Sequence, residues 1–301
     1  MQSSRQRTAA GTLLRVLELL AWTAFFAFAA VFLLLRFWLL PQIDRYQDEV
    51  ASALTHAVGL PVRIGRLHAE WDGLHPRLSL TDLRVFDRDG REALVLPSVE
   101  PVVGWTTLLA RDLRLHSLTI DGPRLKVRRT AEGVLAVAGI ELRPRAEAGR
   151  GDSRLTDWIL EQRDIVIRNA EIEWLDEQRG APPLTLRGLQ LRLRNRGELH
   201  RIGLSARPPQ ELGAGLEVRA ALVGRSVTQP EAWNGRVYAE LGTIDLAGWR
   251  AWVDYPMEVE SGQGALRLWA TFGEGKLVEA TADLALSGVA ARPGEIGRAH
   301  V

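Results

Sequence analysis

The sequence predicts a mainly β protein that is joined to a membrane by one N-terminal helix. Two observations carry this prediction: a long apolar stretch near the start of the chain, and a short apolar pattern that recurs several times after it. Turn-forming clusters such as Asp87–Gly90 and Asp121–Pro123 separate the repeats at close spacing, which favours antiparallel hairpins over parallel strands with crossover helices. We therefore expect a transmembrane helix followed by a long antiparallel sheet with a few short helices.

The apolar stretch starts at Leu19 and contains no charged residue before Arg36. Its continuation to Leu40 makes it 22 residues long, close to the roughly 20 that a helix needs to cross the hydrocarbon core of a bilayer. Trp22 and Trp38 suit the two membrane interfaces. We predict a retained anchor, because the alternative, a cleaved signal peptide, has an apolar region of only about 7–15 residues.

The charges before this stretch predict its orientation. Arg5, Arg7 and Arg15 precede it, and no acidic residue lies before Glu18. The positive-inside rule therefore places the N-terminus in the cytoplasm and everything after Pro41 across the membrane. In a bacterium, the protein would be a single-pass inner-membrane protein with most of its chain in the periplasm.

Composition excludes several classes of function. With 301 residues, 46% hydrophobic and 25% charged, the chain falls in the range of folded proteins. Its 38 basic and 37 acidic residues give a net charge of +1, so the positive field that nucleic-acid binding uses is missing. The chain has no cysteine, which excludes disulfides, thiolate metal sites and cysteine nucleophiles. We expect no nucleic-acid partner, no metal and no cofactor.

The recurring pattern places four apolar residues at positions one, three, six and eight of each copy. Strict alternation would turn the second pair to the opposite face of the strand, because two residues separate it from the first pair. A β-bulge at this doubled step inserts one residue and keeps all four side chains on one face. We therefore expect bent strands with one apolar face. The copies are Val62–Ala69, Leu78–Val85, Leu113–Ile120, Ile165–Ile172 and Leu184–Leu191.

Simple alternation and helical spacing predict the remaining elements. An amphipathic helix over Gln42–Val58 either packs on the core or lies on the bilayer surface. Further strands are expected at Leu216–Leu222, Val237–Leu241, Leu266–Phe272 and Val278–Leu286, and short helices at Val102–Arg111, Leu155–Arg163 and Leu246–Val253. The predicted organisation is a cytoplasmic N-terminus (1–15), an anchor (16–40), a linker helix (41–60), a first sheet segment (61–140), a polar linker (141–154), a second sheet segment (155–290) and a tail (291–301).

No sequence motif for catalysis is present, and we expect no enzyme. Glu171 and Glu173 share a strand face and could pair for acid–base chemistry, but a solvated outer face is the better interpretation. His68 and His75 could meet across a turn to hold a metal, but surface positions again explain them better. We interpret all the scattered histidines as surface or turn residues: His56, His68, His75, His116 and His200.

Several ordered motifs resemble the N-terminal part of the AsmA-like superfamily, and in particular its YhdP-like branch. The similarity extends from the anchor to about Ala290. It includes Gly59–Gly65, Ala69–Leu80, Ile120–Leu125 and Glu132–Gly133, and the more branch-specific Glu173–Leu186, Leu193–Gly197 and Trp249–Trp252.

The resemblance implies a twisted sheet curled into an apolar groove (a β-taco), which would carry phospholipids between the inner and outer membranes without a chemical step. Members of the family are several times longer, so the missing C-terminal part would meet an outer-membrane or other envelope protein. The resemblance implies that inward side chains of the matching strands contact the acyl chains. The candidate lining residues are Leu184, Leu186, Leu189, Leu191, Leu193, Ile165, Ile167 and Ile172.

Two alternatives and one expectation complete the prediction. The apolar face could be an ordinary covered core, and the protein could be a structural or assembly factor that holds envelope proteins through its sheet. The last six residues, Ile296–Val301, can be encoded by a sequence that matches the start of a common sequencing adapter. We therefore expect the reading frame to be interrupted there.

Overall fold

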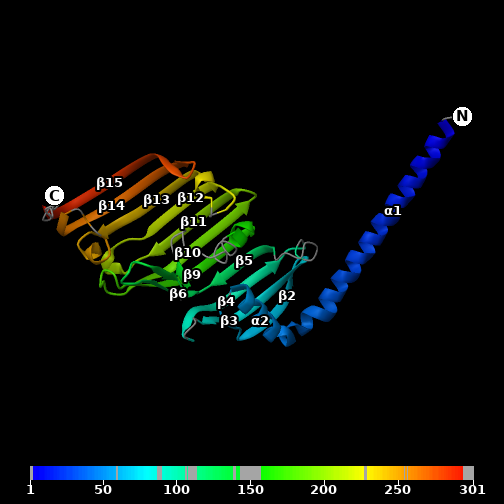
Figure 1. Cartoon of the computed structure of the whole chain (residues 1–301), viewed down its shortest axis with the longest axis horizontal. Coiled ribbons are helices and arrows are strands. Elements are labelled where there is room, and N and C mark those ends of the chain that lie inside the picture. The colour runs from blue at the N-terminus through cyan, green and yellow to red at the C-terminus, as the bar shows by residue number, and fades with distance from the viewer. Residues whose placement is uncertain are drawn as a thin grey trace.

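The structure, a computed structural model, describes residues 3–58, 60–86, 90–105, 107, 114–137, 140–142, 157–226, 229–253, 255 and 257–293. These residues form one long N-terminal helix and a single curved sheet of fifteen strands (Figure 1). The predicted mainly β architecture is confirmed. The tail from residue 296 and most of the polar linker, residues 143–154, lie outside the described residues.

The N-terminal helix, α1 (Ser3–Leu34), contains the predicted apolar stretch. Residues Arg15–Trp38 are long and apolar enough to cross a membrane, and the most apolar window within them has no buried residue. The helix passes into a π-helix, η1 (Leu35–Leu39), and a 3-10 helix, η2 (Leu40–Tyr46). Pro41 lacks the amide hydrogen that a regular α-helix requires, which fits the change of helix type here.

The fifteen strands form one sheet, and most neighbours in space are also neighbours in sequence. The sheet order is β15-β14-β13-β12-β11-β10-β9-β5-β4, after which β3 pairs with β4 and both β1 and β2 pair with β3. The strands are β1 (Val62–Arg63), β2 (Arg66–Asp72), β3 (His75–Phe86), β4 (Glu92–Val103), β5 (Leu115–Asp121), β6 (Arg124–Arg129), β7 (Leu135–Val137), β8 (Ile140–Leu142), β9 (Asp164–Asp176), β10 (Leu184–Arg196), β11 (Leu199–Arg207), β12 (Leu216–Val223), β13 (Asn234–Asp245), β14 (Met257–Gly273) and β15 (Lys276–Pro293).

One junction departs from the expected antiparallel arrangement. β5 and β6 follow each other along the same side of β9, and both run parallel to it. Gly122, in a left-handed conformation (φ 64°), and the buried Pro123 separate the two strands, and the Gly122 amide donates to the Arg168 carbonyl at 2.9 Å. The sheet is therefore mixed, because the chain leaves β6 through β7 and β8 and re-enters at β9 in the same direction.

The predicted bulges are present at the doubled polar steps. Asp82 and Asn169 occupy the left-handed region (φ 55° and 53°), and Gly188 does so at the equivalent step of β10 (φ 61°). β10 shifts register by one residue against β11 between Arg187 and Gln190. The apolar residues on either side of each bulge therefore stay on one face of the sheet, as the pattern predicted.

The short predicted helices are confirmed in part. Leu246–Val253 contains a 3-10 helix, η5 (Gly248–Ala251), and residues 157–161 of the predicted Leu155–Arg163 segment are helical. The helix expected from Val102 is wrong at its start, because Val102 and Val103 still belong to β4 and pair with β5. Much of its remainder, residues 108–111, lies outside the described residues. Two further 3-10 turns are η3 (Gln210–Leu212) and η4 (Pro230–Ala232).

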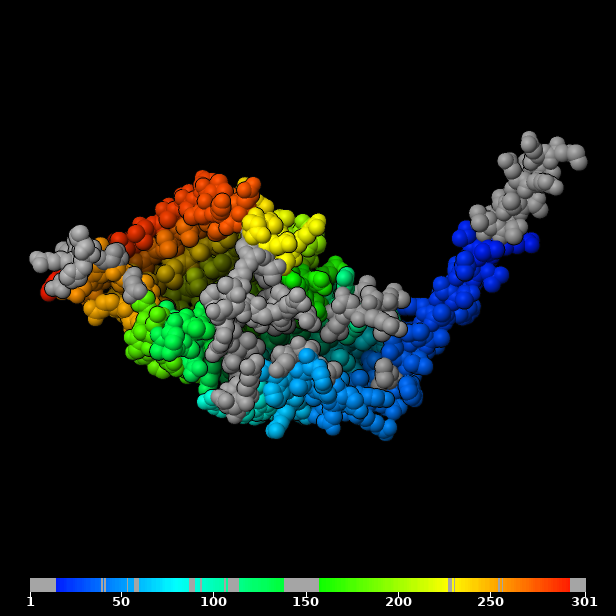
Figure 2. All heavy atoms as spheres, in the orientation of Figure 1, coloured from blue at the N-terminus to red at the C-terminus, as the bar shows by residue number. Residues whose placement is uncertain are grey.

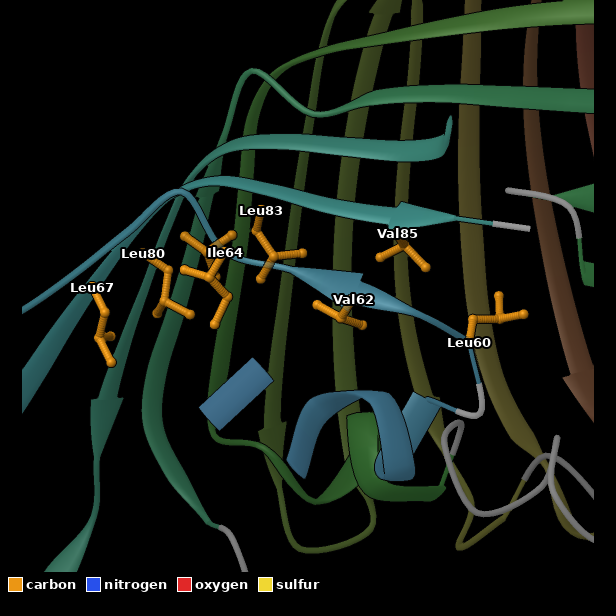
Figure 3. Close-up of a cluster of buried hydrophobic side chains, with 8 residues drawn as sticks. Leu60, Val62, Ile64, Leu67, Leu80, Leu83 and Val85 are labelled. Atoms are coloured by element: carbon orange, nitrogen blue, oxygen red, sulfur yellow. The ribbon is translucent and has the colours of Figure 1, made fainter. Parts of the chain in front are cut away.

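The sheet curves around a hollow. Figure 2 shows this hollow between a rim formed by β14 and β15 and an opposite rim formed by α2 (Gln47–Val58) and the first strands. α2 packs on the apolar face of β1–β4, where Val50, Ala51 and Leu54 contact the buried core cluster. The linker helix therefore packs on the core. Figure 3 shows side chains of this cluster, including Leu67, Leu80 and Leu83, pointing from the strands toward the helix.

Candidate apolar binding face

One face of the sheet carries apolar side chains from the first strands to the last, and we call it the inner face because it lines the hollow. Alternation within each strand and the cross-strand register align these side chains in rows. With a spacing of about 4.8 Å between strands, one row of eleven residues follows the curve for about 48 Å. It consists of Leu67, Leu80, Val99, Ile120, Ile167, Leu191, Leu204, Val218, Ala239, Leu268 and Ala282.

Burial decreases along this row. Leu67 and Leu80 are 3% and 4% exposed under α2, whereas the members from β9 to β14 are half-buried and Ala282 on β15 is exposed. Beyond the row, Leu284 on β15 is 63% exposed. Among the described residues, the inner face is therefore covered at one end and progressively open toward the other.

All eight residues predicted to line a groove lie on this inner face, on the neighbouring strands β9 and β10. Cross-strand pairs join Leu191 to Ile167, Leu193 to Ile165 and Leu186 to Ile172. The buried members are Ile165, Leu184, Leu189 and Leu193, and the half-buried members are Ile167, Ile172, Leu186 and Leu191. The bulge places Leu189 beside Ala170 and Ala206 in one small cluster. The set is thus a contiguous apolar surface, and its role as a lipid lining stays a prediction.

The opposite face of the same strands is polar and carries exposed ion pairs. Arg192 donates to Asp164 at 2.7 Å, Arg219 to Glu217 at 2.7 Å, and Arg267 to Glu240 at 3.2 Å. Charged side chains on this side remain in water, while the inner face is left to apolar contacts. The two faces therefore differ sharply in the kind of molecule that each can bind.

A buried polar cluster closes one end of the inner face, and the sequence interpretation missed it. His200 is 2% exposed, with Nδ1 2.7 Å from the Asn195 Oδ1 and Nε2 2.8 Å from the Gly224 carbonyl oxygen. The Asn195 amide donates to the carbonyls of Ile159 and Gln162 at 3.1 and 2.6 Å. These contacts fix the short helix of residues 157–161 against the strand ends.

The expectation that His200 is a surface or turn residue is therefore wrong. His200 has the same parity as Ile202, Leu204 and Ala206, whose side chains form the inner face of β11. A buried position could have been inferred from that alternation. Residue type alone was misleading, because it does not show the two oxygen atoms beside the ring, which belong to Asn195 across the β10–β11 turn and to Gly224, 24 residues further along the chain.

The other titratable candidates form no catalytic or metal site. His75 stacks on His116, with ring centroids 4.6 Å apart, instead of meeting His68. Burial, followed by the positive charge of His75, lowers the pKa of His116. Glu173 lies 3.8 Å from the Lys126 ammonium, which fits a solvated outer face. Within the described residues, no group of three or more His, Asp or Glu side chains could hold a metal ion.

Comparison with known proteins identifies the family. The family described as "YhdP protein" matches residues 1–300. The chain belongs to this family. It is 26% identical over 246 residues to the intermembrane phospholipid transporter YhdP of Escherichia coli (strain K12), which covers 78% of this chain and 18% of that protein. The chain thus spans less than a fifth of the length of that relative. No solved structure matches the chain.

Proposed function

We propose that this chain is the membrane-proximal part of a bridge-like lipid-transfer protein. In this proposal α1 anchors the chain in the inner membrane of a bacterium, with Arg5, Arg7 and Arg15 on the cytoplasmic side. The inner face then forms a groove in the periplasm that carries phospholipids between the inner and outer membranes. Loss of the protein would alter the lipid content and permeability of the outer membrane. Membership of the YhdP family and the name of the Escherichia coli relative support this proposal.

The observation that carries the proposal is the row of inner-face residues that is half-buried from β9 to β14 and exposed on β15. A row of apolar side chains that is half-buried to exposed over several strands needs an apolar partner, because exposed apolar surface of this extent is unfavourable in water. The side chains are aliphatic and form no polar pattern along the row. Such a surface fits acyl chains, whereas the polar outer face can remain hydrated.

The proposed mechanism is an exchange of one apolar environment for another. An acyl chain that moves from the bilayer to the inner face retains about 0.8 kcal/mol for each CH₂ group that exposure to water would forfeit. The groove therefore lowers the barrier to leaving the membrane. It supplies no direction, since a lower barrier speeds movement equally both ways, and it needs no catalytic residue.

Photo-crosslinking tests the proposal directly. A photo-reactive side chain is placed at Leu191, on the inner face, or at its neighbour Arg192, on the outer face, in the membrane-inserted chain. We expect phospholipid adducts at position 191 and none at position 192, identified by mass spectrometry. Adducts only to protein at position 191 would show a covered face and overturn the lipid groove.

A charge in the row provides a second test. Leu191→Asp places a carboxylate in the middle of the inner face, where an acyl chain would have to pass it, while Arg192→Gln alters the outer face one residue away. We expect loss of the lipid adducts from a photo-reactive residue at Leu268 in the first variant and their retention in the second. Equal adduct yields in both variants, with both proteins correctly inserted, would contradict a continuous lipid path.

A second candidate function is a scaffold for envelope proteins that binds its partner through the sheet. β15 carries Leu277, Val278 and Leu284, which are 58%, 68% and 63% exposed. Such apolar side chains could contact another protein. Protein adducts at Leu284 together with protein adducts at Leu191 would favour this function over lipid transfer.

A further inference from the structure

The junction between the anchor and the sheet is a packed aromatic joint. Phe32 of α1 packs against Trp71 of β2, with ring centroids 4.7 Å apart and the ring planes tilted by 53°, and Phe28 lies 5.0 Å from Trp105, the second residue after β4. The Arg36 guanidinium lies 5.8 Å from the centroid of the Trp71 ring. The sheet is therefore in direct contact with residues inside the apolar span.

Aliphatic packing continues the joint beyond the span. Leu35, Leu40 and Ala69 form a buried cluster, and Leu78 packs against it from β3. Since Ala69, Trp71 and Leu78 belong to the inner-face side of β2 and β3, the joint is also the end of the inner face. Contacts on both sides of Arg36 hold the sheet at a fixed position along the helix.

The positions of these contacts along α1 give the depth of Trp71 and Trp105 in the bilayer. Arg36 is the charge that ends the apolar stretch, and its long side chain places it at the headgroup level. Phe32 and Phe28 lie four and eight residues before it, about 6 and 12 Å deeper at 1.5 Å per residue. Half of a hydrocarbon core of about 30 Å is about 15 Å. The ring of Trp105 is consequently at the depth of the acyl chains, and that of Trp71 is near the interface, which tryptophan favours.

The direction of β2 brings a third residue to this depth. Ala69 packs near Leu35 and Leu40, and Trp71 packs on Phe32, so β2 runs toward the N-terminal end of α1. The turn that follows carries Leu74, a leucine that is 60% exposed. Arg77 pairs with both Asp72 at 2.6 Å and Glu70 at 3.4 Å, so these carboxylates are partly neutralised at the membrane surface.

We propose that this corner of the sheet, formed by Trp71, Leu74 and Trp105, is immersed in the membrane leaflet on the sheet's side. The partner of this surface is the lipid itself. An acyl chain in that leaflet meets this end of the inner face laterally without crossing water, and it then has to pass beside α2, which covers Leu67 and Leu80, to reach the open strands. The immersion rests on the position of the joint along α1, and only the onward route of the lipid rests on the proposed function.

Because the chain contains no cysteine, one probe can be placed at a single position. Leu74→Cys carries an environment-sensitive fluorophore in the full chain, reconstituted into phosphatidylcholine vesicles that contain lipids with a nitroxide on the upper acyl chain. Leu277→Cys is the matched control, since it is also a leucine beside a strand turn and is 58% exposed against 60% for Leu74. The probe at position 277 lies on β15, far along the sheet from the joint.

We expect the nitroxide lipids to quench the probe at position 74 several-fold more strongly than the probe at position 277, and aqueous iodide to show the reverse order. Trp105→Ala, which removes the contact with Phe28, should reduce nitroxide quenching at position 74 and leave position 277 unchanged. Equal iodide access at the two positions would overturn the immersion.

Crosslinking at Leu191 separates this inference from the proposed function. Lipid adducts at position 191 with a water-exposed probe at position 74 would keep the groove and reject this entrance. A lipid-quenched probe at position 74 without lipid adducts at position 191 would keep the immersed corner and reject lipid transfer along the inner face.

Discussion

The two ends of the inner face have the same strand pattern and different coverings. Under α2, Leu67, Leu80 and Val99 are almost completely buried, whereas Val218 and Leu268 occupy the same row and are half-buried. The bulged apolar pattern is common to β3 and β10, so the pattern makes a one-sided strand but does not determine what covers it. The covered end is therefore built as a conventional core, whereas the row at the other end remains partly exposed to solvent.

Contacts of α2 explain why the covered end is stable without a ligand. The Gln47 amide donates to the Ile64 carbonyl at 2.7 Å, and the Val62 amide donates to the Thr55 hydroxyl at 3.0 Å. These bonds join the helix to β1 and to the residues that follow it, while its apolar side chains fill the concave surface. The open end has its own stabilising cluster around His200, but this cluster lies at the strand ends and leaves the middle of the face uncovered.

The largest expected effect comes from truncating the covered core. Leu80→Ala should lower the free energy of unfolding by about 2–5 kcal/mol, because it opens a cavity under α2 that the surroundings cannot fill. Leu268→Ala, in the same row on the open end, should cost clearly less, because its side chain is already half exposed. Chemical denaturation of the full chain in detergent measures both, and equal losses would contradict the comparison.

A smaller effect is expected from the polar cluster of the open end. Asn195→Ala removes two donated hydrogen bonds and leaves His200 without one partner, which should cost about 2 kcal/mol. Gln190→Ala is the control, since its amide is exposed and donates one bond of 3.3 Å to Asn169, so it should cost about 0.5 kcal/mol. Similar values for the two variants would mean that the buried cluster does not stabilise this end.

The parallel junction between the two ends should give a dependence on pH. Arg129 on β6 donates to Asp176 on β9, with Nε 2.8 Å from Oδ1, and this bond lowers the pKa of the buried Asp176 carboxyl. A lowered folded-state pKa means that the stabilisation is present above the unfolded value, near 4, and is lost as the pH falls through the folded value.

We expect Asp176→Asn to lower the free energy of unfolding by about 1.5 kcal/mol at neutral pH. Below pH 4, the stability of this variant should depend less on pH than that of the unchanged protein. Asp164→Asn removes the exposed partner of Arg192 and should cost less than about 1 kcal/mol. Denaturation of both variants from pH 3 to 7 checks the sign. A steeper loss of stability at acid pH in Asp176→Asn would contradict the assignment of this pH dependence to Asp176.

The smallest expected effect concerns the bulge that keeps the strands one-sided. Gly188→Ala should cost about 1 kcal/mol, because its backbone is left-handed (φ 61°) although no atom lies within 4 Å of the added methyl group. Gly203→Ala on the next strand meets equally open space without a left-handed backbone, and should be neutral or slightly stabilising. A thermal melt of both variants separates backbone strain from lost space, and matching shifts would exclude strain.

Local pattern predicted much of the fold and of the candidate face. Hydrophobic spacing identified the anchor, the bulged strands and the later alternating strands, because each signal lies within about ten consecutive residues. The bulged pattern placed the eight candidate lining residues on one face, from Ile165 to Leu193. The helix expected from Val102 was wrong at its start because pairing with β5 extends β4 to Val103, and such pairing is not visible in local spacing; residues 105 and 107 are helical.

By itself, the sequence determined that this protein has a helix long and apolar enough to cross a membrane and a long one-sided sheet, since both follow from the spacing of apolar residues along the chain. Only the tertiary structure decided which part of the apolar face is covered, how β9 joins β5 and β6 in parallel, and that the His200 ring lies against the Gly224 carbonyl. Those features depend on contacts between residues that are distant in sequence. α2 covers the face of β1–β4 because the chain after the helix folds back beside it. The apolar pattern of a single strand does not specify this contact.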